Sequence, residues 1–204
     1  MAEHTDRISP LAGYAGAFAA TGGTGAELAE LAFCTQLNLR LDPKGDAAER
    51  VALALGAPLP SGPNTCTRAG TLTICWLGPD EWLLLGEPDR AAELAARVSG
   101  ALGKEFGSVV DVSASRTTIR LAGLQARDVL AHGCALDLHP RVFGPGQCAQ
   151  TLLARAGVLL IADDDGAWRI LVRSSFARYL ADWLLDASLE YRGPALDAPP
   201  GSTS

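Results

Sequence analysis

The clearest pattern in the chain is a strict alternation of polar residues and leucines between Gln36 and Leu41. Side chains point to opposite faces at successive positions of a strand, so this alternation predicts a half-buried strand that starts near Thr35. Asp46 then precedes a short apolar-periodic segment that stops at Gly56. We expect Asp46 to cap a short helix there.

The residues that follow, from 58 to 113, also show short apolar segments separated by turns. After a stretch rich in Pro, Ser and Gly over 58–64, the pattern predicts strands over 72–77 and 81–85 around a Gly78-Pro79 turn, a helix over 91–102 stopped by Gly103, and a strand over 109–113. The order is strand, helix, strand, strand, helix, strand. This order is typical of the split βαβ, or ferredoxin-like, arrangement.

A related pattern begins again at Thr117. It predicts strands over 117–122, 148–153, 158–162 and 168–172, a helix over 124–132 stopped by Gly133, and a long final helix. Ser174 or Ser175 is expected to cap that helix. Its apolar stripe consists of Phe176, Tyr179, Leu180, Trp183, Leu184 and Ala187. The predicted fold class is α+β, with two split βαβ halves.

The two ends of the chain lack such patterns. Residues 1–30 are apolar but interrupted by glycines, so we expect an irregular apolar arm that a partner orders, because fixing its backbone alone costs about 1 to 2 kcal/mol per residue. Residues 31–192 are expected to form a single compact α+β domain of two intertwined halves. Residues 193–204, rich in proline, are expected to be a disordered tail.

Composition excludes several classes of function. The chain is 48% apolar, 20% charged and carries a net charge of −6, which argues against a nucleic-acid partner. No apolar run is long enough to span a membrane. Leu11 to Ala20 resembles a short signal peptide, but Glu3 and Asp6 spoil its positive flank. Five cysteines without C-x-x-C spacing argue against a disulfide framework or a zinc knuckle, so we expect a cytoplasmic protein.

Two sets of residues suggest chemistry but fit it poorly. Gly23-Thr24-Gly25 before a possible helix suggests a nucleotide site, although no clean strand precedes it and the third glycine position is Leu28. The second set comprises a possible metal cluster, or with Ser113 a nucleophile and base: Cys134, Asp137, His139 and Cys148. That set lacks the paired cysteines or histidines of a zinc site. We therefore predict no catalytic, cofactor-binding or metal-binding residues on this chain.

Asp111 is more informative, because it lies between two valines in a strand that is expected to be buried. A buried carboxylate needs a partner, so Asp111 either pairs with Arg116 or Arg120, accepts hydrogen bonds from turn amides, or binds a ligand amine or pterin.

Two further pairs surround the turn at Gly78-Pro79. Asp80 and Glu81 are adjacent and point in opposite directions, which makes them a poor acid/base pair. Trp76 and Trp82 are interface anchors if exposed and core residues if buried.

Six runs of residues, in this order, resemble a known family: Ser9-Pro10-Leu11, Asn38-Leu39-Arg40, Trp76-Leu77-Gly78-Pro79-Asp80-Glu81-Trp82-Leu83-Leu84, Val109-Val110-Asp111-Val112-Ser113, Gly133-Cys134-Ala135-Leu136-Asp137-Leu138-His139 and Arg173-Ser174-Ser175-Phe176-Ala177. Together they resemble the gamma-subunit family of heterotetrameric sarcosine oxidases. The resemblance extends from about Ser9 to Tyr191.

This resemblance implies a fold similar to the folate-binding domain of the aminomethyltransferase family. It also implies a non-catalytic subunit of an oxidoreductase complex that demethylates sarcosine to glycine, forms hydrogen peroxide and passes the one-carbon unit to tetrahydrofolate. FAD, FMN, NAD and tetrahydrofolate are then expected in partner chains, namely larger flavin-bearing alpha and beta subunits beside a small delta subunit.

Other functions remain open from the sequence. An equivalent subunit of N-methylglutamate dehydrogenase, or of another secondary-amine demethylating flavoenzyme, would have a similar chain. A stand-alone folate-binding aminomethyltransferase-like protein would be nearly twice as long. The folate-dependent iron-sulfur maturation proteins carry a Lys-Gly-Cys-Tyr-x-Gly-Gln run. Its nearest counterpart here, Gly144-Pro145-Gly146-Gln147-Cys148, lacks the Lys and the Tyr.

Overall fold

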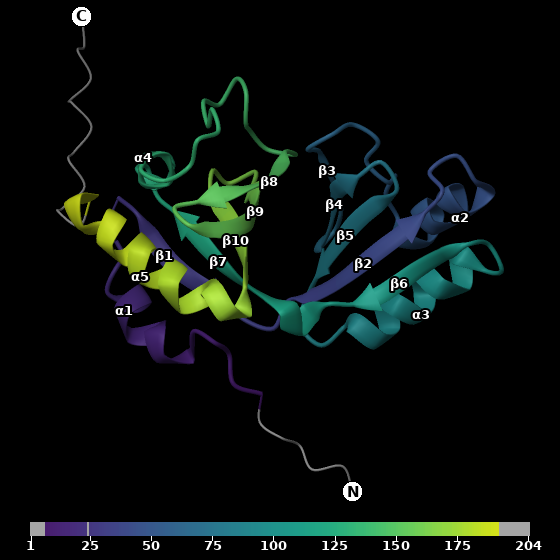
Figure 1. Ribbon diagram of the computed structural model, residues 1–204, viewed down its shortest axis with the longest axis horizontal. Helices are drawn as coiled ribbons and strands as arrows, with labels where there is room; N and C mark the ends of the chain where they lie inside the picture. The colour runs from purple at the N-terminus through teal and green to yellow at the C-terminus, as the bar shows by residue number, and fades with distance from the viewer. Residues whose placement is uncertain (1–6, 24, 192–204) are drawn as a thin grey trace, which may run out of the picture.

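The computed structural model describes residues 7–23 and 25–191, which form two five-stranded antiparallel sheets with helices on their outer sides (Figure 1). The first sheet has the strand order β3-β4-β5-β2-β6. Its half of the chain consists of β2 (Thr35–Leu41), α2 (Asp46–Leu55), β3 (Cys66–Ala69), β4 (Leu72–Gly78), β5 (Glu81–Gly86), α3 (Ala91–Leu102) and β6 (Gly107–Asp111).

The predicted split βαβ arrangement is confirmed in this half. Strands β2 and β4 both pair antiparallel to β5, so they are parallel to each other with β5 inserted between them. Helix α2 lies between β2 and β4 in the chain, and α3 connects β5 to β6. Strand β3, which the sequence pattern did not predict, pairs with β4 at the edge of the sheet.

The second half repeats this order with one exchange. It contains β7 (Arg116–Ala122), α4 (Ala126–Ala131), β8 (Cys148–Leu153), β9 (Ala156–Ala162), β10 (Trp168–Arg173) and α5 (Ala177–Ala187). Its sheet has the order β1-β7-β10-β9-β8. The strand next to β7 is β1 (Glu27–Leu31), which takes the place that β6 takes next to β2. The second half therefore receives a strand from the N-terminal part of the chain.

The prediction of an irregular arm over residues 1–30 is wrong for residues 12–19 and 27–30, which lie in regular elements. The structure contains η1 (Ala12–Tyr14), α1 (Ala15–Ala19) and β1. Leu11 and Phe18 are only 1% and 4% exposed and belong to the core of the second half. One edge of β1 pairs with β7, and the chain's own core covers the apolar side chains of Leu11 and Phe18, so contacts within the chain support the order of this segment. Residues 1–6 and 24, and the predicted tail over 193–204, lie outside the described residues.

Each half has a core between its sheet and its helices, and a third core lies between the two sheets. Figure 1 shows α2 and α3 on the outer side of one sheet and α4 and α5 on the outer side of the other. Leu84 packs into the helix-side core, whereas Leu83 and Leu85 face the second sheet. Because successive side chains of β5 reach opposite faces and both faces are covered, its leucine run is apolar throughout.

The helix starts differ from the predictions. Helix α2 begins at Asp46 itself, so Asp46 is not its cap. The Ala47 amide donates a hydrogen bond of 3.2 Å to the carboxylate of Glu105, which lies in a distant part of the chain. Neither Ser174 nor Ser175 caps α5, because both lie in the short helix η3 (Ser174–Phe176) that precedes it. The Ser174 hydroxyl instead donates to the Ala114 carbonyl at 3.0 Å.

The apolar stripe of α5 is only partly buried. Leu180 and Leu184 are fully enclosed, but Phe176 and Tyr179 lie at the surface. Trp183 packs against Gly133, where an added Cβ would lie 2.6 Å from the indole Cζ2. Gly133 thus permits the close approach of its loop to α5.

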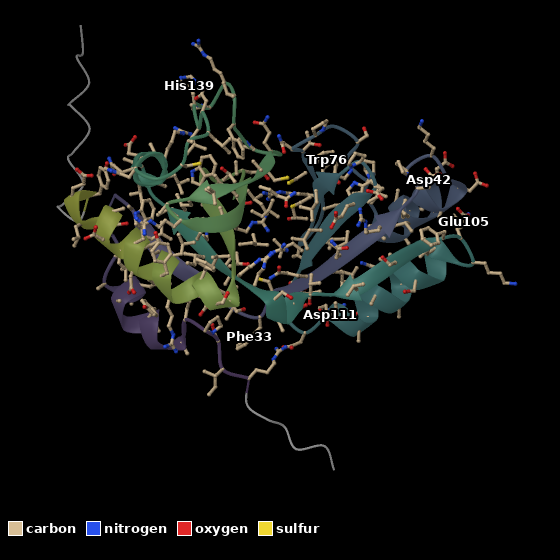
Figure 2. All side chains as sticks on the ribbon, viewed as in Figure 1. Phe33, Asp42, Trp76, Glu105, Asp111 and His139 are labelled. Carbon is tan, nitrogen blue, oxygen red and sulfur yellow. The ribbon has the colours of Figure 1, made fainter. Side chains whose placement is uncertain are left out.

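The two tryptophans of the β4–β5 hairpin lie opposite each other. Trp82 is buried and its indole nitrogen donates 2.8 Å to the Pro60 carbonyl, so it is a core residue. Trp76 is partly buried against the same core. Figure 2 shows Trp76 near the top of this hairpin.

Candidate functional site

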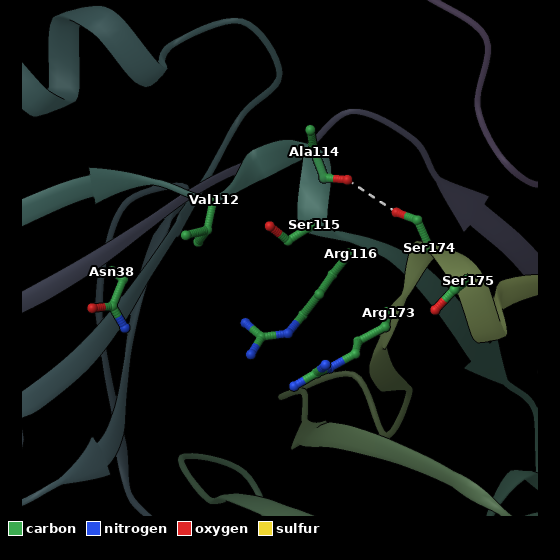
Figure 3. Close-up of a pocket in the computed structure, with 8 residues that line it drawn as sticks. All are labelled: Asn38, Val112, Ala114, Ser115, Arg116, Arg173, Ser174 and Ser175. Carbon is green, nitrogen blue, oxygen red and sulfur yellow. Dashed lines mark hydrogen bonds between the residues drawn. The ribbon is translucent and has the colours of Figure 1, made fainter.

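The most distinctive polar feature is a cleft between the two halves that is lined by two arginines. Arg116 begins β7 and Arg173 ends β10, and the strand register places them directly opposite each other. Figure 3 shows both side chains directed into the same cleft. The cleft has a volume of about 560 Å³ and is lined by Asn38, Val112, Ala114, Ser115, Arg116, Arg173, Ser174 and Ser175.

Two short helices fix the positions of the arginines. Helix η2 (Ser113–Ser115) precedes Arg116, and η3 follows Arg173. The hydrogen bond from the Ser174 hydroxyl to the Ala114 carbonyl joins these two turns (Figure 3). The backbone therefore holds both arginine side chains on one side of the sheet.

Like charges directly opposite on paired strands destabilise a sheet. Within the described part of the chain, no salt bridge includes Arg116 or Arg173. Burial, and then the charge of Arg173, lower the pKa of Arg116 from its ordinary value, while Glu81 acts in the opposite direction. The cleft is thus electropositive, and its chemistry suits an oxyanion such as a carboxylate or a phosphate group.

Asp111 does not form the predicted ion pair. It is exposed at the end of β6, and its carboxylate accepts hydrogen bonds from the Ser113 amide at 2.9 Å and the Ser113 hydroxyl at 2.6 Å. Of the three expectations, the acceptance of turn hydrogen bonds describes this geometry. Arg120 instead pairs with Asp165 at 2.7 Å. The expectation of a buried strand fails because β6 is an edge strand.

A second cavity of about 490 Å³ adjoins the arginine cleft and includes Asp111 and Arg116 in its wall. The guanidinium of Arg7 lies over the ring of Phe33, 4.6 Å from its centroid. Figure 2 shows Asp111 and Phe33 at the same end of the molecule, near the junction of the halves.

The residues considered as a metal cluster or a nucleophile are dispersed. Cys134 packs against the core of the second half, and Cys148 lies between the sheets. His139 accepts a hydrogen bond from the Arg141 amide in a surface loop, and Asp137 accepts one from the His139 amide. Figure 2 places His139 at the opposite end of the molecule from Asp111, and Ser113 hydrogen-bonds Asp111.

The remaining sequence candidates have structural contacts. Gly25 is followed by strand β1 rather than by a helix, and Thr24 lies outside the described residues. Arg40 bonds Asp80 at 3.1 Å and lies 3.7 Å from Glu81. Both carboxylates thus face a common cation.

One cluster of reactive side chains was missed by the sequence patterns. Cys66, Cys75 and Cys148 bring their sulfur atoms within 4.8 Å of one another. Cys66 and Cys75 are opposite partners in the β3–β4 hairpin. The available signal was the spacing of these two cysteines about the turn at Gly70, but it becomes visible only once β3 is recognised as a strand.

Comparisons with known proteins agree with this fold. A family model described as "Sarcosine oxidase, gamma subunit family" matches residues 40–190. The sarcosine oxidase subunit gamma of Corynebacterium sp. (strain U-96) is 42% identical over 190 residues, which are 91% of each chain. That of an Arthrobacter species is 38% identical over 193 residues, covering 93% of this chain and 94% of the relative.

Two solved structures are also similar. The heterotetrameric sarcosine oxidase from Corynebacterium sp. U-96, in complex with pyrrole 2-carboxylate, contains a chain matched with a TM-score of 0.84 and 40% identity, covering 91% of this chain and 96% of that one. The glycine cleavage system aminomethyltransferase from Bartonella henselae matches with a TM-score of 0.64 at 16% identity and shows the shared fold. This chain covers 48% of it.

Within the described residues, no helix combines the length and the apolar character needed to cross a membrane. The family model covers most of the chain, and relatives of about 40% identity cover nearly all of it. This chain belongs to the sarcosine oxidase gamma subunit family.

Proposed function

We propose that this chain is the non-catalytic gamma subunit of a heterotetrameric sarcosine oxidase. The complex oxidatively demethylates sarcosine to glycine, forms hydrogen peroxide and passes the one-carbon unit to tetrahydrofolate. The observation that carries this proposal is the near-complete match, at a TM-score of 0.84, to a chain of a heterotetrameric sarcosine oxidase.

The positions of the candidate catalytic side chains favour a structural role for this chain over a catalytic one. Ser113, His139 and Cys148, considered as parts of a catalytic group, lie in separate parts of the fold, and Asp111 is engaged by a turn. Leucine and cysteine side chains fill part of the space between the sheets. In this proposal, FAD, FMN, NAD and tetrahydrofolate bind to the partner chains. The proposal also places the complex in the cytoplasm.

The surface offers apolar side chains for contacts with alpha, beta and delta subunits. Phe106 is 99% exposed, Leu124 86% and Leu53 82%. Large apolar side chains at this exposure are candidates for burial against another chain. Because the arm over residues 7–23 is packed on its own chain, these side chains replace it as the expected contact points.

The test is purification of the tagged chain from its own cells, with the untagged strain as control. We expect larger flavin-bearing chains to co-purify, and the complex to consume oxygen with sarcosine. The chain produced alone is expected to be colourless and inactive. Recovery of the chain without partners would contradict the proposal. Oxidation of N-methylglutamate but not of sarcosine would instead favour the related dehydrogenase.

A further inference from the structure

Three cysteines from both halves converge at the junction of the two sheets. Cys66 lies in β3, Cys75 in β4 and Cys148 in β8. Their sulfur atoms all lie within 4.8 Å of one another, and the sulfurs of Cys66 and Cys75 are 3.3 Å apart. Cys75 and Cys148 are buried and Cys66 is half-buried. Cys75 and Cys148 are members of the core between the sheets, and Cys66 packs against it.

The backbone holds this cluster in place from both sides. The Cys66 amide donates to the Gly146 carbonyl at 2.7 Å, and the Cys148 amide donates to the Asn64 carbonyl at 2.9 Å. Thr65 and Gln147 form an antiparallel bridge between these two bonds. The strand register of β3 and β4 fixes Cys66 opposite Cys75. The three sulfurs are thus preorganised, which reduces the cost of assembling a ligand set.

The donor set determines which ion fits. Three thiolates bound in a trigonal plane to one metal, with bonds of about 2.3 Å, lie about 4 Å from each other. The sulfurs of Cys66 and Cys75 are closer, at 3.3 Å, and all three lie within 4.8 Å, so a small separation of Cys66 from Cys75 completes the triangle. Within the described residues, no histidine, aspartate or glutamate joins the group. A structural zinc ion takes four ligands, whereas thiolates also select the soft ion Cu(I).

We propose that Cys66, Cys75 and Cys148 form a trithiolate binding site for a soft, low-coordinate metal ion of the Cu(I) class. Binding forms three metal–sulfur bonds and releases the thiol protons to solvent, and no electrons are transferred. This site is independent of the proposed subunit role.

The test uses the protein with whatever chains accompany it from its own cells, reduced and kept under anaerobic conditions. Cu(I) is titrated in competition with a chromogenic Cu(I) chelator. The variants are Cys66→Ser and Cys148→Ser. Cys34→Ser is the matched control, because Cys34 is a half-buried thiol outside the cluster. Cys66 is the more accessible of the first two positions, so its variant guards against misfolding of the other.

We expect the wild type and Cys34→Ser to bind one more equivalent of Cu(I) than either cluster variant, with only sulfur ligands in the copper X-ray absorption spectrum. Size-exclusion chromatography should show the same assembly for all variants. Equal Cu(I) binding by all four proteins would overturn the proposal. So would nitrogen ligands on the copper, or a Cys66–Cys75 disulfide that persists in the isolated protein.

Discussion

Arg116 and Arg173 face each other across β7 and β10, and the described part of the chain provides neither with a salt bridge. This arrangement costs stability unless an anion lies between the two guanidinium groups. Replacing one arginine removes the repulsion between the two guanidinium groups and also weakens any bound anion, so measurements with and without an anion separate the two effects on stability.

For Arg173→Gln we expect stability in low-salt buffer to rise by about 0.2 to 1 kcal/mol, because the opposed charges are removed. Added phosphate should stabilise the wild type and have a smaller effect on the variant. The measurement is urea unfolding with and without phosphate. Arg120→Gln is the control, because Arg120 already pairs with Asp165. An equal response to phosphate in all three proteins would contradict the prediction.

For Asp111→Ala we expect a loss of about 1 kcal/mol, because two exposed hydrogen bonds to Ser113 disappear and no buried cation is left unpaired. Asp111→Asn keeps an acceptor oxygen and should lose less. Urea unfolding of both variants tests this. A loss of 3 kcal/mol or more, the size typical of a broken buried ion pair, would show that the carboxylate is buried in solution.

For Phe18→Ala we expect a loss of about 3 to 5 kcal/mol, because the ring is enclosed in the core of the second half. Ile8→Ala, at a side chain that is 80% exposed, should change stability by less than about 0.5 kcal/mol. Thermal unfolding of the assembled protein compares them. Equal effects would mean that the arm does not pack on its own chain.

For Gly133→Ala we expect a loss of about 1 to 3 kcal/mol, because the new methyl group overlaps the Trp183 ring. Gly157→Ala provides a matched control, since nothing lies within 4 Å of its added Cβ. A shift in Trp183 fluorescence confined to the first variant would confirm the contact. Unchanged stability of Gly133→Ala would argue against it.

The pH dependence of stability should report the buried thiols. Hydrogen bonds with Cys148 and Cys66, together with burial, raise the pKa of the Cys75 thiol from its ordinary value of 9.0. Above that pH the unfolded chain loses the thiol proton while the folded chain keeps it. Stability should therefore fall as pH rises above about 9, by up to about 1.4 kcal/mol per pH unit for one proton. Cys75→Ala should show a shallower decline in the free energy of unfolding, measured in urea between pH 8 and 10; an identical slope would contradict this.

Local periodicity correctly predicted the helices and strands in which the alternation of apolar and polar side chains follows their burial. The alternation over β2 and the helical spacing over α3 both matched the structure. Strand β1 was missed because its partner is distant in the chain, with Glu27 paired to Ala122. Strand β3 was missed because its four residues adjoin a loop rich in proline and glycine.

The candidate sites were harder to predict than the fold. The opposition of Arg116 and Arg173 depends on the register of β7 against β10, and the cysteine cluster depends on contact between two sheets. The arginine pair leaves no short spacing in the sequence, and for the cysteines only the spacing of Cys66 and Cys75 about Gly70 was available. By contrast, the sequence predicted that Asp111 is a buried charge that needs a partner. Asp111 lies instead on an edge strand, where its carboxylate is exposed.

Because β1 lies beside β7, in the second half of the fold, a circular permutation that moves β1 to the C-terminal end of the chain should preserve the fold. The Gly25 amide donates to the Tyr191 carbonyl at 3.2 Å, and the Tyr14 hydroxyl bonds the Asp182 carboxylate at 2.8 Å, so the beginning and the end of the described chain are neighbours. A chain that carried β1 after α5 would read as two consecutive copies of one topology. In the natural order, β1 is synthesised about ninety residues before its partner β7, as the Glu27–Ala122 register shows. Strand β1 therefore stays unpaired while the whole first half is synthesised.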